Sequence, residues 1–545
     1  LRAKTRRIKS KTRKTRNKTS GRKEEQSMGD MMLEHGKMPV STPEEQGVSS
    51  AAIISFLDRC KREQLELHSL QIVRNGKLIT SAIAKPFTEK SFHRIFSAAK
   101  GVVATGMLLA IQDGYYDLHE LVVPRLPKEW IPEDLDEKWN RLTIYHLLTM
   151  NTGHDCDTLF QMWGKSDCWI KTFFEVRPAY EPGTYFRYDM GAQYVMNELV
   201  RLATGKDLGR YLKPRIFDPL GIEYTNNYTE PEGHFFSSTI QFHPDALTKL
   251  SQLYLQKGSW EGKQLIREDL AVAAGQHHVP CNHYRDSGSG QPDSTSGYGF
   301  HLWRNSVGGF RFSGGQGQFG IVLPDQNMAV GILATENDNR KILQAFFGEV
   351  FTHLYKLPMR PDPKNQKKLQ DMCENFNLAP QKGDAVGNIA SLVNGKTYVF
   401  TENPIGQKSI SFGFREDYVE IQSEDEKGAV THVCGYDGKW IHNKGSRYLL
   451  HAGDPDSIAD LDRIFYYDTH DVMLSGSWQS ADSFAFTLRS DSLLCGYPYV
   501  CRFLKDRIEI SVPAYTFQPR NKTGKGDVVT LTRSEEHTSE LQSPM

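Results

Sequence analysis

Apolar residues recur at helical spacing in several segments of this chain. The spacing predicts helices over residues 52–64, 97–114, 142–153, 191–206 and 338–356. Three of these segments run into a glycine near their end, and glycine favours the left-handed conformation that terminates a helix. The middle of the first 356 residues is therefore predicted to be largely helical.

Strand-like patterns occupy both ends of the same region. Two short alternating segments flank Asn75 and Gly76, and an Asn-Gly pair in this position is a strong hairpin signal. Residues 297–335 again consist of short apolar runs separated by tight, glycine-containing turns. Strands at both ends with helices between them predict an α+β domain whose sheet is assembled from distant segments.

The pattern changes once more after residue 356. Residues 357–392 are rich in Pro, Lys, Asn and Gly, which is typical of a linker. Residues 393–532 contain many short alternating segments with Gly and Asp between them, which predicts a small all-β domain, either a sandwich or a barrel. Such a domain could cover the first domain, pair subunits or bind a ligand, and the pattern does not distinguish these roles.

The two ends of the chain have unusual compositions. We expect residues 1–39 to be a disordered or non-native extension, because residues 1–23 contain twelve Lys or Arg and no acid, and Met28 is the first methionine. The run RSEEHTSELQS within residues 533–545 resembles a translated sequencing adapter, so this tail is left out of the fold prediction. The main domain is therefore expected over residues 40–356.

Composition narrows the classes of function. The formal net charge of the 545 residues is zero, and without residues 1–23 the chain has 54 basic and 66 acidic residues, a net charge of −12. An acidic body argues against nucleic-acid binding by the folded part, although the basic segment could bind polyanions. No apolar run reaches the roughly 18 residues that cross a bilayer. No secretory signal is visible, and eight cysteines without a CxxC pair fit free thiols in a reducing compartment, so we expect a cytoplasmic protein.

The most informative motif is the Ser-Ala-Ala-Lys run from Ser97 to Lys100, at the start of an apolar helical segment. A serine hydroxyl is a poor nucleophile at neutral pH. An amine three residues later on a helix lies on the same face, one turn away, where it can accept the serine proton. The pattern alone is weak evidence, because it also occurs from Ser20 to Lys23. The alternative is a serine that caps a helix and a solvated lysine.

An ordered series of further segments resembles one protein family. In chain order they are PEEQGVSS, HSLQIVRNGKLI, FSAAKG, LTIYHLLTMNTGH, EPGTYFRYD, LATGKDLGRYL, DPLGI, GYGFHLW and FSGGQGQFGIVLP. They resemble blocks of the class C β-lactamase-related serine hydrolases, which include β-lactamases, D-alanyl-D-alanine peptidases, β-lactamase-like esterases and 6-aminohexanoate-dimer hydrolases. The resemblance implies a β-lactamase/DD-peptidase-like α+β fold, an antiparallel sheet flanked by helices, and no metal or organic cofactor.

The resemblance also implies a catalytic set. Ser97 would be the acylated nucleophile, Lys100 its proton partner, and Tyr188 the tyrosine that helps to deprotonate the serine and protonates the leaving group. Because free tyrosine has a pKa of about 10, a nearby lysine cation would be needed to bring Tyr188 into use. The alternative for Tyr188 is a plain core residue.

The third family motif aligns with residues 312–314, and its strand would bind the substrate carbonyl. Ser313 and Gly314 would lie beside the substrate, and the backbone N–H groups of Gly315 and Ser97 would stabilise the oxyanion. A glycine at this point allows close approach of the backbone to the carbonyl. The alternative is that the glycine-rich run only forms a hairpin turn.

Two residues depart from the family pattern. Met190 replaces an Asn that contacts substrate amides in many relatives, and Phe312 replaces a Lys or His that recognises a carboxylate or assists catalysis. Both departures weaken the case for β-lactams and stem peptides. We expect a small-molecule ester or amide as substrate, with the oligomeric state open. The alternative function is a catalytically inactive, penicillin-binding-like sensor or binding protein.

One other segment gathers zinc-type ligands, namely His277, His278, Cys281 and His283. No second group with matching spacing follows, so we interpret this segment as a loop and predict no metal site. The same interpretation applies to a sparser group in the C-terminal region, His432, Cys434 and His442. Two histidines near the motifs are not assigned as bases: His146 is interpreted as a packing residue, and His93 as structural or substrate-facing.

Overall fold

The computed structural model describes most of the chain between residues 36 and 531. The described residues are 36–162, 166–226, 239–281, 292–336, 338–378, 383, 387, 389–400, 407–425, 428–436, 438–446, 470–490, 496–505, 507–513 and 528–531. The basic segment 1–23 and the adapter-like tail 533–545 lie outside them. None of the helices in this described part is both long and apolar enough to span a membrane.

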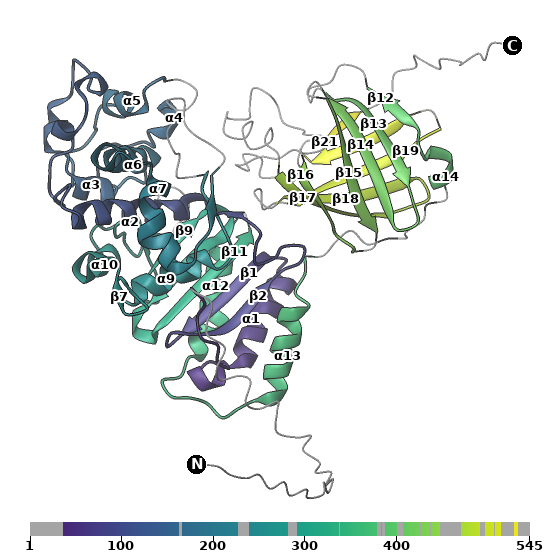
Figure 1. Ribbon diagram of the computed structural model, residues 1–545, viewed down its shortest axis with the longest axis horizontal. Coiled ribbons are helices and arrows are strands. Elements are labelled where there is room, and N and C mark those ends of the chain that lie inside the picture. The colour runs from purple at the N-terminus through teal and green to yellow at the C-terminus, as the bar shows by residue number, and fades with distance from the viewer. Residues whose placement is uncertain are drawn as a thin grey trace, which may run out of the picture.

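A six-stranded antiparallel sheet forms the centre of the N-terminal domain (Figure 1). Its strands, in spatial order, are β2 Lys77–Ile83, β1 Glu66–Arg74, β11 Met328–Thr335, β10 Gln318–Leu323, β9 Phe310–Gly314 and β8 Trp303–Arg304. The predicted hairpin is confirmed, because Asn75 and Gly76 both have positive φ and join β1 to β2. The pairing of β1 with β11 joins the two ends of the domain, as the α+β pattern predicts.

Helices cover both faces of this sheet, which explains why β1 is buried along nearly its whole length. On one face lie α1 Ser50–Arg62, α12 Arg340–Glu349 and α13 Pro363–Glu374, which share a core with the sheet. The other face packs against α2 Ala99–Gln112 and α9 Ala246–Leu255. Helix α2 is apolar on all sides and almost completely buried, so it is the central helix of the domain.

The remaining helices are α3 Ile144–Leu148, α4 Leu159–Met162, α5 Trp169–Glu175, α6 Met190–Thr204, α7 Leu208–Leu212, α8 Asp218–Leu220, α10 Glu268–Ala274 and α11 Pro292–Thr295. Most of them share a core with α2, while α11 packs against β8. Two small sheets, β3 His93–Arg94 with β5 Gln241–Phe242 and β4 Tyr224–Thr225, and β6 Ser259–Trp260 with β7 Lys263–Gln264, complete the domain. The helix predicted over 142–153 is shorter than expected, because Met150 has a φ of 54° and takes the chain out of the helix.

The stretch 357–392, expected to be a linker, contains the packed helix α13. Leu369 of this helix is 5% exposed and belongs to the core beneath the sheet. Figure 1 shows α13 alongside α1, so the N-terminal domain continues past residue 356. The amphipathic spacing of Leu369, Met372, Cys373 and Phe376 was the signal for this helix within an otherwise polar stretch.

The C-terminal domain is all-β, as predicted, with the short helix α14 Ala390–Val393 at its start. Its ten-stranded sheet curls into a barrel-like shape (Figure 1). The strands are β12 Thr397–Val399, β13 Gln407–Phe414, β14 Tyr418–Asp425, β15 Gly428–Tyr436, β16 Ile441–Ser446, β17 His470–Trp478, β18 Ser483–Ser490, β19 Gly496–Phe503, β20 Ile508–Pro513 and β21 Val528–Leu531. Aromatic side chains such as Phe412, Trp478 and Phe484 fill the interior, so the barrel has a packed core.

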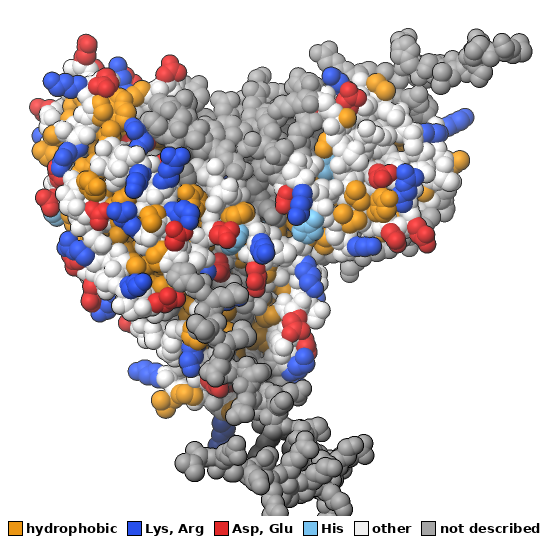
Figure 2. Space-filling view, in the orientation of Figure 1, with side chains coloured by type: hydrophobic (Ala, Val, Ile, Leu, Met, Phe, Trp, Pro, Cys, Tyr) orange, Lys and Arg blue, Asp and Glu red, His pale blue; other side chains and the backbone are white. Residues whose placement is uncertain are grey.

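The two domains are joined by an ion pair and a small apolar cluster. Both guanidinium Nη atoms of Arg489, on β18, donate to the carboxylate of Glu66 at the start of β1, at 2.8 Å each. Beside this pair, Phe87, Leu378 and Met473 pack together across the domain boundary. On the face shown in Figure 2, positive and negative side chains are interspersed over the described surface.

Replacing Glu66 by Gln is expected to destabilise the protein by about 3 kcal/mol, because it leaves the guanidinium of Arg489 buried without its carboxylate. Although burial opposes ionisation, hydrogen bonds from Arg489 and His68 hold the pKa of Glu66 well below its ordinary value. The difference in the free energy of unfolding between wild type and Glu66→Gln should therefore be largest at neutral pH and shrink as the pH falls below about 4. Urea-induced unfolding measures it.

The matched control is Arg502→Gln, which removes an ion pair to Asp482 whose two side chains are 59% and 39% exposed. Exposed pairs contribute little, so a loss of about 0.5 kcal/mol or less is expected. Equal losses for Glu66→Gln and Arg502→Gln would contradict the role of Glu66 in holding the domains together.

Candidate active site

Ser97 lies in a single 3₁₀ turn, Phe96–Ala98, that leads directly into α2. The residue before it, Phe96, is buried and has a φ of 47°, a conformation that non-glycine residues rarely adopt. Such strain at a single residue requires support from the surrounding structure and is common at functional sites. The turn therefore presents Ser97 from a fixed and strained backbone.

Strand β9 provides that support by crossing the turn at very short range. A Cβ atom added to Gly314 would lie 2.2 Å from the carbonyl oxygen of Ile95 and 3.2 Å from the backbone nitrogen of Ala98. No side chain fits there, so Gly314 is required for the strand to lie against the serine turn. A Cβ atom added to Gly315 would lie 3.7 Å from the nearest atom of the Phe96 ring, which is an ordinary van der Waals distance.

Lys100 lies one helical turn after Ser97, and its Nζ donates to the Ser97 Oγ at 3.1 Å. The lysine is 1% exposed, and burial lowers its pKa to about 8, while the carboxylates of Asp157 and Asp189 act in the opposite direction. An amine with this pKa is partly neutral near physiological pH. Lys100 can therefore accept a proton from Ser97.

Tyr188 lies just before α6, and Lys100 Nζ lies 4.7 Å from the centre of its ring. Burial raises the pKa of Tyr188 above its ordinary value, and the neighbouring Ser97 side chain only partly offsets this. The sequence analysis required a lysine close to Tyr188, and Lys100 lies there. In this environment Tyr188 keeps its proton and can serve as a hydrogen-bond donor or acid.

The three predicted motifs meet at one pocket of about 180 Å³. Its walls are formed by Ser97, Tyr188, Ser294, Trp303, Arg311, Ser313, Gly314, Gly315, Phe319, Asn339, Arg340 and Leu343. Of the predicted residues, Lys100 lies behind Ser97 and is not part of the wall, whereas the others line it. The structure thus brings the predicted nucleophile, tyrosine and glycine-rich strand together.

The two departures from the family pattern do not open onto this pocket. Phe312 is fully buried beneath Gly101 of α2 and meets Tyr254 edge to face. Met190 is the first residue of α6, and its backbone N–H donates to Asp157 at 3.0 Å. The position at which relatives have a cation is thus occupied by core packing. Arg311 and Arg340, which the motifs did not indicate, are the cations that line the wall.

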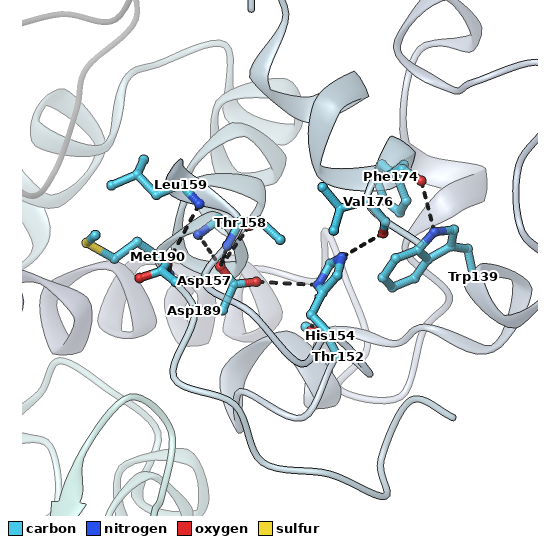
Figure 3. Close-up of polar contacts among 11 residues, drawn as sticks. Trp139, Thr152, His154, Asp157, Thr158, Leu159, Phe174, Val176, Asp189 and Met190 are labelled. Carbon is cyan, nitrogen blue, oxygen red and sulfur yellow. Dashed lines mark hydrogen bonds and ion pairs between the residues drawn. The ribbon is translucent and has the colours of Figure 1, made fainter. Parts of the chain in front are cut away.

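A polar network around Asp189, the residue after Tyr188, was not anticipated from the sequence (Figure 3). Asp189, the N-cap of α6, is fully buried, and its Oδ1 accepts from Gly191 N and from both the N and Oγ1 of Thr158. The other oxygen lies 3.4 Å from Nδ1 of His154. The Nε2–H of His154 donates to the carbonyl of Val176 at 3.0 Å. The only sequence signal was Asp189 directly before a helix, which is typical of an N-cap.

Asp157 is the second carboxylate of this network. Its Oδ1 accepts from the backbone N–H groups of Met190 and Leu159, at 3.0 and 3.2 Å. Burial raises the pKa of Asp157 to about 7, the nearby charge of Asp189 adds to this rise, and Lys100 opposes it. Asp189 has a pKa below its ordinary value, because its hydrogen bonds from His154 and Thr158 outweigh the effect of burial.

Within the described residues, no group of three or more His, Cys, Asp or Glu side chains is arranged to hold a metal ion. His283 lies outside the described residues, and His278 stacks on Phe300 at 4.3 Å. In the C-terminal domain, His432 pairs with Ser446 at 2.7 Å. His146 has the predicted packing role, because its Nδ1 accepts from the backbone of Thr143 in a helix cap.

His93 is fully buried in β3 and does not line the pocket. Its ring packs against Phe87 and His68, with centroid distances of 4.5 and 5.7 Å. Of the two roles considered for His93, structural or substrate-facing, the structure supports the structural one.

Comparison with solved structures finds many proteins of similar fold. They include a penicillin-binding protein homologue from Caulobacter crescentus, with 15% identity over 57% of this chain and 100% of that chain, TM-score 0.44. A second is the octameric penicillin-binding protein homologue from Pyrococcus abyssi. It has 12% identity over 89% of this chain and 99% of that chain, with a TM-score of 0.43. A third is EstCE1, a hydrolase with promiscuous acyltransferase activity. It has 15% identity over 54% of this chain and 97% of that chain, with a TM-score of 0.44.

No curated protein matches the chain. A family model does: the model described as Beta-lactamase matches residues 58–345, which is more than half of the chain and spans Ser97, Tyr188 and the strand β9. With the helix-flanked antiparallel sheet and the serine–lysine turn at its centre, this match shows that the chain belongs to the Beta-lactamase family of hydrolases.

Proposed function

We propose that this protein is a serine hydrolase that cleaves an ester or amide through an acyl-enzyme on Ser97. The observation that carries the proposal is the hydrogen bond between Lys100 Nζ and Ser97 Oγ, 3.1 Å long, in a turn that faces a pocket. A buried amine directly beside a serine hydroxyl has no role in stabilising an exposed helix start, whereas it is what nucleophilic catalysis requires.

Each side chain has one task in this mechanism. Neutral Lys100 accepts the proton of Ser97 as the Oγ attacks the carbonyl carbon, and a tetrahedral intermediate forms. The backbone N–H groups of Ser97 and Gly315 stabilise its oxyanion. Tyr188, which burial keeps protonated, donates a proton to the leaving group. Water then attacks the acyl group, and the proton transfers run in reverse to free Ser97.

The pocket wall narrows the substrate class. The described lining residues include no Asp or Glu, and their two arginines are already engaged. Arg340 is paired with Asp338 at 2.6 Å, and the buried Arg311 donates to backbone carbonyls, so the wall suits a neutral substrate. The volume of about 180 Å³ suits a short acyl group. Met190 lies outside the wall, so the amide contact of many relatives is not reproduced at that position.

The nucleophile is tested with a fluorophosphonate probe, which forms a covalent bond to an activated serine. We expect one adduct per chain by intact-mass measurement, and complete loss of it in Ser97→Ala. The exposed Ser480, in a turn of the C-terminal domain, gives the control variant Ser480→Ala, in which labelling should be unchanged. Absence of the adduct on wild type, or its survival in Ser97→Ala, would favour the alternative of an inactive binding protein.

The substrate class is tested with a panel of short acyl esters, a chromogenic β-lactam and a D-Ala-D-Ala peptide, each with wild type and Ser97→Ala. Esters are expected to be turned over fastest, because Phe312 and Met190 do not supply the family's usual contacts to β-lactams and stem peptides. Turnover of the β-lactam at a rate comparable to the esters would overturn this substrate assignment.

The protonation state of Lys100 predicts a pH dependence. Because burial lowers its pKa to about 8, the rate constant of probe labelling should rise with pH, reach half of its maximum near pH 8 and level off above about pH 9. The rate constant is measured from about pH 6 to about pH 10. A rate constant that does not change with pH in this range would contradict the role of Lys100 as the base.

A further inference from the structure

The buried ammonium of Lys100 lacks a direct ionic partner. Among the described residues, its ammonium donates one hydrogen bond, to the neutral Ser97 hydroxyl, and the centre of the Tyr188 ring lies 4.7 Å away. No carboxylate among the described residues lies within ion-pairing distance of it, although the lysine is 1% exposed. The charge of Lys100 is therefore stabilised from a distance, by the carboxylates of Asp157 and Asp189.

These two carboxylates differ in the number of hydrogen bonds that they accept from neighbouring groups. The Oδ1 of Asp189 accepts three hydrogen bonds, from Gly191 and Thr158, and its Oδ2 faces His154 at 3.4 Å. These hydrogen bonds keep Asp189 ionised at the N-terminus of α6, so its charge does not change near neutral pH.

Asp157 has a looser environment (Figure 3). Only its Oδ1 is engaged, by the two backbone N–H groups of Leu159 and Met190, and the residue is partly exposed. Met190, which donates one of these hydrogen bonds, is two residues after Tyr188, and the Tyr188 ring lies beside Lys100. The Asp157 carboxylate is therefore held near the lysine. Burial and the charge of Asp189 raise the pKa of Asp157 to about 7, so its charge changes near neutral pH.

Tyr188, Cys156 and His301, three other titratable groups near Lys100 and Asp157, are neutral at that pH. Burial raises the pKa values of Tyr188 and of Cys156, which therefore stay protonated. His301 is buried near Lys100, its Nε2–H donates to the carbonyl of Leu147 at 3.0 Å, and burial lowers its pKa to about 3. Asp157 is thus the group whose charge varies around Lys100, while that of Asp189 does not.

We propose that Asp157 is a positioning residue for catalysis: its carboxylate holds the proton on Lys100 and so sets the pH at which Ser97 becomes nucleophilic. The proposal rests on the proposed function. Asp157 moves no atom of the substrate, because the proton of Ser97 still passes to Lys100 Nζ. The carboxylate instead determines what fraction of Lys100 is neutral and ready to accept it.

Asp157→Asn tests this directly, because the Asn Oδ1 still accepts from Leu159 and Met190 while the negative charge is gone. Without that charge the pKa of Lys100 falls, so the midpoint of the pH–labelling curve should move down by about one pH unit. At pH 7 the variant should then react with the fluorophosphonate roughly five-fold faster than wild type. The wild-type curve should also be the broader one, since two coupled groups titrate in it.

The matched control is Asp155→Asn, which removes an exposed carboxylate two residues away and should leave the midpoint unchanged. Asp157→Ser, a second neutral variant that can accept from the same N–H groups, is expected to shift the midpoint in the same direction if the Asn variant does not fold.

A midpoint in Asp157→Asn equal to or above that of wild type, with labelling still abolished by Ser97→Ala, would overturn the role of Asp157 alone. A wild-type protein that takes up no probe would instead overturn the proposed function. A faster reaction at pH 7 together with the lower midpoint supports the proposal, because loss of a merely structural contact would slow the reaction.

Discussion

Strand β9 crosses the turn that carries Ser97 at a distance that only a glycine allows. The backbone of Gly314 lies against the carbonyl of Ile95, and a Cβ there would be 2.2 Å from that oxygen. This contact fixes the strained Phe96–Ser97 turn from one side, while the buried helix α2 fixes it from the other. The pocket, the lysine behind it and the strand along it all depend on this approach, because a shift of β9 would separate the serine from the backbone groups proposed to bind its substrate.

Burial shifts the pKa values of the two titratable side chains beside Ser97. Lys100 is placed where water cannot solvate its charge, which lowers its pKa to about 8. The same burial raises the pKa of Tyr188, so the two neighbours are driven toward their neutral forms. In the proposed mechanism the neutral amine beside Ser97 would be the base, and the protonated phenol of Tyr188 would be the acid. The carboxylates behind them, Asp157 and Asp189, moderate this effect from outside the hydrogen-bonding distance of the amine.

Much of the fold, and the segments that carry Ser97, Lys100 and Tyr188, could be predicted from the sequence, because they depend on short-range patterns. The Asn75-Gly76 hairpin, the apolar helix after Ser97 and the alternating strands after residue 393 each carry their signal within a few residues. What could not be predicted depends on contacts between distant residues. Glu66 and Arg489 are 423 positions apart, and Asp157 acquires its importance only when α6 is packed beside it. Likewise, Phe312 was interpreted as a change in the pocket, although its strand turns the side chain into the core.

The central claim is that Ser97 becomes acylated during turnover, and a rapid-mixing experiment with a slowly deacylating nitrophenyl ester tests it most directly. The account predicts a burst of about one nitrophenolate per chain before steady state. Acid quenching in the burst should leave the acyl mass on the peptide that contains Ser97. Steady hydrolysis without a burst and without an acylated peptide, or an acyl group on any other residue, would contradict the account.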